Sequence, residues 1–314
     1  MSNSEWTITG AEAGTRLDKW LADLARLGSR SRAAAALSRG QVFVGDEEQS
    51  LAGGGRLVRA GDRVRVWIDR PGTAARRAGR RRIHGLDIVF EDDRLLVVDK
   101  PAGLLTVPLD DGAGAPSLAA AVSAHWRSHG RREALVVHRI DRDTSGLVVF
   151  ARDRAAWGAL KQQFLERSAE RVYLAVVEGV PQPPAGTWRD ALRWDARALR
   201  QVPAARGGRG AIEAVTHFAT AEAFARASQL ELRLETGRQH QIRAQAWRHG
   251  HPLVGERDYR DPGGAPAIEF GRQALHARQL AFVHPASRRV VRFEAPIPAD
   301  LRRLLKALRA ETRR

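Results

Sequence analysis

The chain has 314 residues, of which 43% are hydrophobic; this length and composition predict two domains and exclude a disordered protein. It has no cysteine, which excludes disulfides and thiolate chemistry. It also lacks a membrane-length apolar run and a secretory signal, so a cytoplasmic protein without membrane association is expected. With 52 basic and 36 acidic side chains the net charge is +16, which favours a polyanionic partner such as nucleic acid.

The first predicted domain covers residues 1–70. Apolar side chains recur at helical spacing in residues 16–27, which predicts an amphipathic helix with one buried stripe formed by Leu17, Trp20, Leu21, Leu24 and Leu27. A second helix is expected at 31–38, ended by Arg39-Gly40, and short strands are expected at 41–44 and 63–68. The segment is rich in arginine, and its candidate RNA contacts are Arg16, Arg30, Arg32 and Arg39.

The stretches RLDKWL, SRSRAAAALSRGQVFV and AGDRVRVW resemble an S4-like RNA-binding domain of small α/β architecture. An alanine run at 33–36 and Gly45-Asp46 depart from the usual pattern. The alternative is a small helical cap whose arginines are merely solvated. Residues 71–82 follow with Pro, Gly and many arginines, and this composition predicts a flexible basic linker.

Residues 83–314 are expected to form one larger domain. Apolar or alternating runs predict strands at 86–89, 95–98, 146–151, 172–177 and 230–234. Helices are predicted at 157–165, 239–247 and 298–308. Because strands and helices do not alternate strictly, the expected fold class is α+β with a mixed, largely antiparallel sheet.

The densest polar segment is VHRIDRDTSGLVVFAR, residues 137–152, in which a polar loop precedes an apolar strand. A rigid strand that ends in a polar loop is a common way to present reactive groups. Asp141 stands among arginines, and nearby positive charge favours the ionised form of a carboxyl group. The residues alone allow two interpretations, a nucleophile or base at Asp141 and an inert salt-bridged turn.

HRIDRDTSGLVVFAR resembles the central motif of the RluA-type pseudouridine synthase family, whose catalytic aspartate corresponds to Asp141. Three further segments resemble family motifs in the same order. These are IVFEDDRLLVVDKPAGLLTVP at 88–108, FLERSAERVYLAVVEG at 164–179, and LETGRQHQIRAQAWRHGHPLVGERDY at 234–259 followed by RQALHARQLAFVHP. Asp99, Arg171 and Gln239 replace the more usual Asn, Lys and Thr.

The resemblance implies that this domain converts uridine to pseudouridine in RNA after flipping the base out of its stack. Arg139 is then expected to fill the gap left by the base, Tyr173 to stack on the uracil, and Arg243 to hold Asp141 through bidentate geometry. Asp141 acts as a nucleophile or as a base on C2′, and the second role is preferred. Ile242 and Leu275 are pocket candidates with core packing as the alternative, and His138 and Arg142 are candidate RNA contacts.

The expected substrate is structured RNA, large-subunit ribosomal RNA first and transfer RNA as the alternative. The protein is expected to need no cofactor and to be a monomer. The histidines at 240, 249, 251 and 276 lack a tight ligand spacing, so no metal site is expected either. A rival hypothesis from another class is an RNA-binding or ribosome-assembly factor in which catalysis is absent or secondary. A metal-dependent hydrolase is the other rival.

Overall fold

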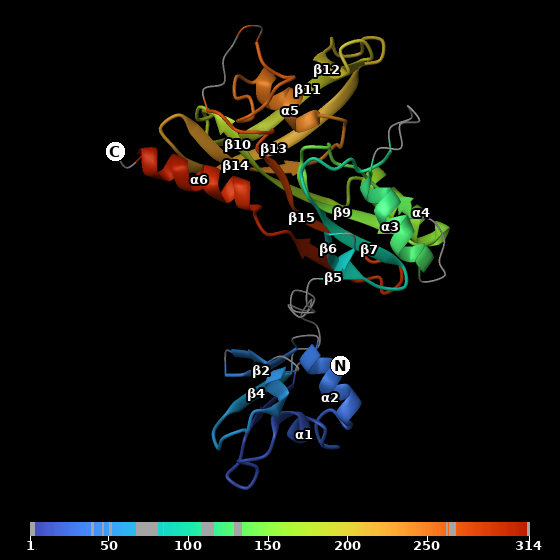
Figure 1. Cartoon of the computed structure of the whole chain (residues 1–314), viewed down its shortest axis with the longest axis vertical. Coiled ribbons are helices and arrows are strands. Elements are labelled where there is room, and N and C mark those ends of the chain that lie inside the picture. Colours follow the sequence, from blue (N-terminus) through green and yellow to red (C-terminus); the bar gives the residue numbers. More distant parts are fainter. Residues whose placement is uncertain are drawn as a thin grey trace. The chain divides into compact units, whose positions relative to one another are not determined.

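The computed structural model of the chain describes residues 4–38, 41–45, 47–49, 52–66, 81–83, 85–108, 116–128, 134–261, 263 and 268–312. Two compact units are present, Met1–Arg81 and Arg82–Arg314 (Figure 1). Of the linker predicted at 71–82, residues 71–80 lie outside the described residues, as does Arg39. The prediction is wrong for residues 81 and 82, because they begin strand β5 (Arg81–Ile83).

The first unit packs two helices and a short 3-10 helix on a four-stranded antiparallel sheet. The strand order is β1-β4-β2-β3. The elements are β1 (Ser4–Thr7), α1 (Leu17–Leu21), α2 (Arg30–Ser38), β2 (Val42–Val44), β3 (Glu47–Gln49), η1 (Ala52–Gly55) and β4 (Arg63–Val66). The buried core joins both helices to the sheet through Leu17, Leu21, Leu37, Val42 and Val64. Arg16, Arg30 and Arg32 are exposed around it.

The predicted helix at 16–27 is mostly wrong, because α1 ends at Leu21. The chain then turns: Asp23 accepts hydrogen bonds from the backbone N–H groups of Ala25, through its side chain, and Gly28, through its carbonyl. The Arg26 guanidinium lies 3.7 Å from the centre of the Trp20 ring and also donates to the Trp20 carbonyl. This compact turn leaves Leu24 91% exposed, although the helical pattern placed it in the core.

The second unit is built on a 12-stranded sheet. Its main path runs β12-β11-β13-β14-β10-β15-β9-β7-β6-β5, with β16 beside β15 and β8 beside β9. Besides β5, its strands are β6 (Leu86–Glu91), β7 (Leu95–Lys100), β8 (Leu135–Val136), β9 (Ser145–Ala151), β10 (Glu170–Glu178), β11 (Ala185–Asp195), β12 (Arg200–Pro203), β13 (Ile212–Ala223), β14 (Ala227–Leu234), β15 (Leu275–Val283) and β16 (Val290–Glu294). The expected α+β class with a largely antiparallel sheet is confirmed. The long strands β11 and β13 had not been predicted.

Alternating side chains of these strands enter two cores. Leu96, Val98 and Val148 face helix α3 (Leu118–Ser128), whereas Val97 and Val149 face α4 (Arg154–Leu165). Farther along the sheet, one face of β10 packs on α6 (Ala299–Thr312), and α5 (Gln241–Arg248) lies over β11 and β13 (Figure 1). The predicted helices at 157–165, 239–247 and 298–308 therefore exist with shifted ends.

One strand pair, β9 with β15, is parallel, and it determines where the polar loop lies. Its register pairs Ser145 with His276 and Gly146 with Ala277, so both strands begin at the same place. Gly146 has φ +116°, and a Cβ atom there would lie 2.2 Å from the Ala277 carbonyl oxygen. Only glycine permits this approach. Because parallel strands start together, the loop that ends at Thr144 meets the start of β15 at Leu275.

Candidate active site

Asp141 belongs to the loop before β9, and Lys100 anchors that loop. The Lys100 side chain is fully buried, and its Nζ donates to the carbonyls of Pro101, Leu104 and Arg142 at 2.9, 2.7 and 2.8 Å. Burial lowers the pKa of Lys100 to about 7. Three acceptors satisfy all three ammonium protons, so this one side chain links the end of β7 to the residue after Asp141.

Two further contacts hold the loop from other elements. Thr106 Oγ1 donates to the Ile140 carbonyl at 2.6 Å and lies 3.2 Å from the Ile140 N–H, which it accepts. Arg272 Nη1 donates to the carbonyls of Asp143 and Leu275, at 3.0 and 3.1 Å. The same guanidinium pairs with Asp300 at the start of α6. Asp141 is therefore flanked on both sides by residues whose backbone is fixed.

A pocket opens at the Asp141 side chain. Its lining comes from the loop, from β10, from the end of β14, from the segment before α5, from α5 and from β15: Arg139, Ile140, Asp141, Thr144, Tyr173, Leu234, Arg238, His240, Gln241, Ile242, Arg243 and Leu275. Six residues singled out in the sequence are thus brought together, namely Asp141, Tyr173, Arg243, Arg139, Ile242 and Leu275. Ile242 and Leu275 also belong to the core, so packing and pocket lining are compatible.

Arg243 approaches Asp141, but the expected bidentate geometry is wrong. Its Nη1 lies 3.6 Å from Asp141 Oδ2. The paired hydrogen bonds go instead to Glu256, at 2.8 Å from Nε and 2.7 Å from Nη2, and Nη2 also contacts Asp258 at 2.6 Å. Burial opposes the charge of Arg243, yet these acids raise its pKa above its ordinary value. The guanidinium is held rigidly by Glu256 and presents one remaining nitrogen to Asp141.

Tyr173 lies on β10 opposite Ala277 of β15 and is 8% exposed. Burial raises its pKa to about 12, so the phenol keeps its proton near neutral pH. Arg171, two residues earlier, donates to the Glu235 carbonyl at 3.2 Å. A Cβ atom on Gly237 would lie 2.3 Å from Arg171 Nη1, so the Arg171 guanidinium packs closely against the 235–238 turn. This turn carries Arg238 to the pocket.

Two of the predicted RNA contacts lie outside the pocket lining. The His138 ring stacks on Phe164 with centroids 4.7 Å apart, and its Nε2 accepts from the Val149 N–H at 3.2 Å. Burial lowers the pKa of His138 to about 3, so the ring is a neutral packing element, and the prediction of an RNA contact finds no support. Arg142 is exposed, and its Nη2 lies 3.4 Å from Asp143 Oδ2.

The sequence reasoning missed several residues of the site. Glu256 and Asp258 lie in GERDY, within the motif at 234–259, but nothing in their spacing indicates that they bind Arg243. Lys100 was visible as one of only four lysines in the chain, in the apolar context VVDKPAG. His240 stands out in the sequence only as one of four histidines that lack a metal-ligand spacing. Its Nε2 lies 3.9 Å from Asp141 Oδ1.

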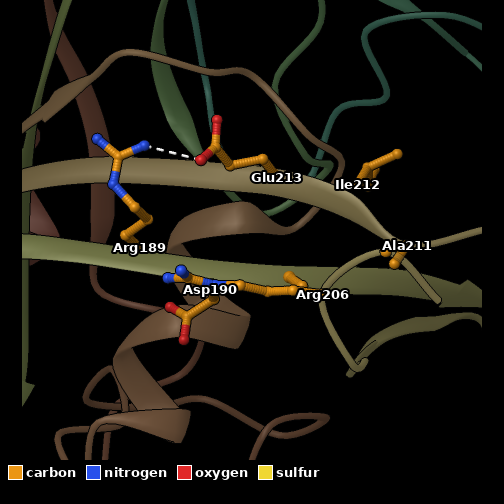
Figure 2. A pocket seen from close by; sticks show the side chains of 8 residues that line it. Arg189, Asp190, Arg206, Ala211, Ile212 and Glu213 are labelled. Carbon is orange, nitrogen blue, oxygen red and sulfur yellow. Dashed lines mark hydrogen bonds and ion pairs between the residues drawn. The ribbon is translucent and has the colours of Figure 1, made fainter.

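A second hollow, of about 320 Å³, lies on β11, β13 and the 206–211 segment (Figure 2). In it, Arg189 Nη1 donates to Glu213 at 2.7 Å. The Asp190 carboxylate turns away toward α5, where Gln245 and Arg248 bind it, each at 2.8 Å. The charged side chains of this hollow are thus largely paired with one another or with α5. Asp141 and the residues around it do not line it.

Two kinds of feature are absent from the part of the chain that the structure describes. No group of three or more His, Asp or Glu residues is placed there to hold a metal ion. Across those same residues, no helix is both long and apolar enough to cross a membrane.

Residues 94–247 match the RNA pseudouridylate synthase family. The chain is 37% identical over 308 residues to an RNA pseudouridine synthase of Synechocystis sp., covering 94% of this chain and 90% of that protein. It is 36% identical over 315 residues to the ribosomal large subunit pseudouridine synthase D of Neisseria meningitidis, covering 95% and 80%. The solved structure of human RNA Pseudouridylate Synthase Domain Containing 4 shares the fold, with a TM-score of 0.59 at 23% identity over 71% of this chain and 92% of that one.

The chain therefore belongs to the RluA-type RNA pseudouridine synthase family. It is an isomerase that acts on RNA.

Proposed function

We propose that the chain isomerises specific uridines of large-subunit ribosomal RNA, with Asp141 as the catalytic base. The relatives named as large-subunit synthases support this substrate. The observation that carries the proposal is the placement of the Asp141 carboxylate. It is 19% exposed at the pocket, with Arg243 Nη1 3.6 Å from Oδ2. Tyr173, Ile242 and Leu275 supply flat and apolar walls, against which a flipped base can pack.

In this mechanism the Asp141 carboxylate takes the proton from ribose C2′. The C2′–H electron pair forms a C1′=C2′ double bond as the N1–C1′ bond breaks, and the uracil leaves as an anion. The base then turns so that C5 bonds to C1′, and Asp141 returns its proton to C2′. The proton on C5 is finally lost to solvent while N1, freed from the sugar, takes up a proton from solvent, so the product is a neutral isomer of uridine. No redox partner enters, and Asp141 ends in its starting form.

The pocket residues have matching roles. Arg243 keeps the Asp141 carboxylate charged and oriented, because a rigid cation stabilises an anion without reorganising. The protonated Tyr173 stacks on the uracil and donates a hydrogen bond rather than accepting a proton. Arg139 is exposed at the rim, where a planar cation can replace the flipped base in the stack. The arginines Arg16, Arg30 and Arg32 of the first unit bind the RNA backbone, as an S4-like domain would.

Chemical mapping of pseudouridine in total RNA tests the proposal, with a carbodiimide adduct that stops reverse transcription. Cells carry the wild-type chain, no chain, Asp141→Asn, or the matched control Asp143→Asn, whose side chain faces Arg142. One or a few stops in large-subunit ribosomal RNA should vanish without the chain and with Asp141→Asn only. Stops lost from transfer RNA would instead reassign the substrate. If deletion changed no stop, an RNA-binding factor without catalysis would be the better hypothesis.

A further inference from the structure

His240 occupies an unusual position at the edge of the pocket. It precedes α5 with φ 54° and ψ 18°, a left-handed conformation that costs a non-glycine residue on the order of 1 kcal/mol or more. Its side chain is 15% exposed and lies in van der Waals reach of aromatic neighbours, with the Trp194 and Tyr259 ring centroids each 5.7 Å away and both rings edge-on. The strained backbone thus delivers an imidazole between two buried or half-buried rings, directly beside Asp141.

The hydrogen bonds of Tyr259 determine which imidazole nitrogen carries the proton. The Tyr259 side chain is fully buried, and its hydroxyl accepts from the Gln201 N–H at 2.7 Å. The same oxygen lies 3.0 Å from His240 Nδ1. Burial raises the pKa of Tyr259, so the phenol stays protonated, and its O–H group donates a hydrogen bond to Nδ1. Burial also lowers the pKa of His240, although Asp141 opposes this shift, so the neutral ring carries its proton on Nε2.

This tautomer directs an N–H group at the catalytic carboxylate. His240 Nε2 lies 3.9 Å from Asp141 Oδ1, whereas Arg243 Nη1 lies 3.6 Å from Oδ2. Both separations are longer than a hydrogen bond, and a movement of less than about 1 Å would close each one. The Tyr259 ring also supports the Arg243 guanidinium, whose carbon is 5.2 Å from the ring centre. One buried tyrosine therefore contacts both donors that face the oxygens of Asp141, His240 through a hydrogen bond and Arg243 through its ring.

We propose that His240 is a positioning residue for Asp141. With its tautomer fixed by Tyr259, it donates from Nε2 to Oδ1 once substrate closes the pocket and so sets the rotation of the carboxylate, while Arg243 holds Oδ2. The remaining lone pair of Oδ1 then faces the ribose. This inference rests on the proposed function, because it assigns His240 a part in orienting the base of that reaction. A histidine that only fills space would need neither a fixed tautomer nor a donor at Nε2.

The test measures kcat and KM of the full chain on in vitro transcribed large-subunit ribosomal RNA that contains uridine tritiated at C5. Pseudouridine formation releases the tritium to water. The variants are His240→Ala, His240→Asn, His240→Gln and Tyr259→Phe. A glutamine amide can reach the place of Nε2, whereas an asparagine amide is too short. His249→Asn is the matched control, because His249 ends the same helix and hydrogen-bonds Asp190 at 3.1 Å, outside the pocket.

A lost positioning contact predicts that His240→Ala lowers kcat about 100-fold with KM within about threefold. His240→Gln should recover at least tenfold of that loss, His240→Asn should not, and Tyr259→Phe should lower kcat about tenfold because the tautomer is no longer fixed. His249→Asn should stay within twofold of wild type. Full activity of His240→Ala, or equal kcat for the Gln and Asn variants, would overturn the inference. If the Ala variant does not fold, the Gln and Asn pair alone decides.

The failure of the proposed function has a different signature. In that case the wild-type chain releases no tritium from this RNA, and the inference about His240 falls with it. If the wild-type chain is active and the His240 variants match it, only the inference fails.

Discussion

Arg243 and Glu256 form a buried ion pair with two hydrogen bonds, of 2.8 and 2.7 Å, directly behind the Asp141 carboxylate. The Glu256 side chain is fully buried, and that of Arg243 is 7% exposed. The pair leaves Nη1 of Arg243 as the nitrogen that faces Asp141. The position of the cation at the site is thus determined by Glu256, an acid 13 residues farther along the chain, rather than by Asp141.

Arg243→Lys should be strongly destabilising although the substitution retains the positive charge. A lysine cannot make the two parallel bonds, so Glu256 would be left buried without a matched partner, at a cost of about 3 kcal/mol in the free energy of unfolding. Activity should fall about 100-fold as well, because the cation no longer faces Asp141 rigidly. Urea unfolding and tritium release from labelled RNA measure the two effects.

Arg248→Lys serves as the control for that change. Arg248 lies on the same helix and pairs with Asp190, but its side chain is 42% exposed, so the substitution should cost less than about 1 kcal/mol. The double variant Arg243→Met with Glu256→Gln should be more stable than Arg243→Met alone, because no buried charge is then left unpaired. Equal stability of these two variants would show that Glu256 does not depend on Arg243.

The second unit should lose stability on mild acidification. Burial lowers the pKa of His276 to about 4 and that of His138 to about 3, from an unfolded value near 6.5. Between about pH 6.5 and 4 the unfolded chain therefore binds more protons than the folded chain, so the free energy of unfolding decreases as pH falls. Each histidine contributes up to about 1.4 kcal/mol per pH unit inside this window. Urea unfolding at several pH values between 7 and 4.5 gives the slope.

His276→Gln tests the assignment of that slope. His276 Nδ1 lies 3.0 Å from Ser145 Oγ, and the His276 side chain is fully buried. A glutamine side chain does not titrate, so the variant should lose stability at pH 7 but show a slope smaller by about 1 kcal/mol per pH unit. An unchanged slope in His276→Gln would mean that other groups cause the acid sensitivity.

Two exposed arginines of α2 should contribute to RNA affinity through phosphate contacts. Each phosphate contact releases counterions, so Arg30→Ala with Arg32→Ala should reduce the slope of log affinity against log salt by about 1.5. Fluorescence anisotropy of labelled ribosomal RNA fragments at several salt concentrations measures this slope. The matched control removes two other exposed arginines of the same unit, Arg59 and Arg63. Equal losses in both double variants would indicate unspecific attraction by net charge instead of a contact at α2.

The site was predictable to different degrees. Asp141, Tyr173 and Arg243 lie in segments whose residue order resembles family motifs, so the sequence was enough to propose them as site residues. The bidentate partner of Arg243 was not predictable, because Glu256 reaches it only after α5 ends and the chain returns. His138 stands next to Arg139 in the sequence, but its side chain stacks on Phe164 of α4. No local pattern indicated that contact.

The sequence by itself indicated the family and a short list of site residues through motifs that resemble those of a known family. The pattern of apolar side chains along the chain indicated the fold class. Only the tertiary structure decided which of these residues meet. The parallel register of β9 and β15, possible only with a glycine at Gly146, places the Asp141 loop beside Leu275. Tyr259 and Gln201 are 58 residues apart, yet Gln201 donates a hydrogen bond to the Tyr259 hydroxyl, whose own proton is thereby directed to His240 Nδ1. Such contacts join segments that are distant along the chain, so no local pattern records them.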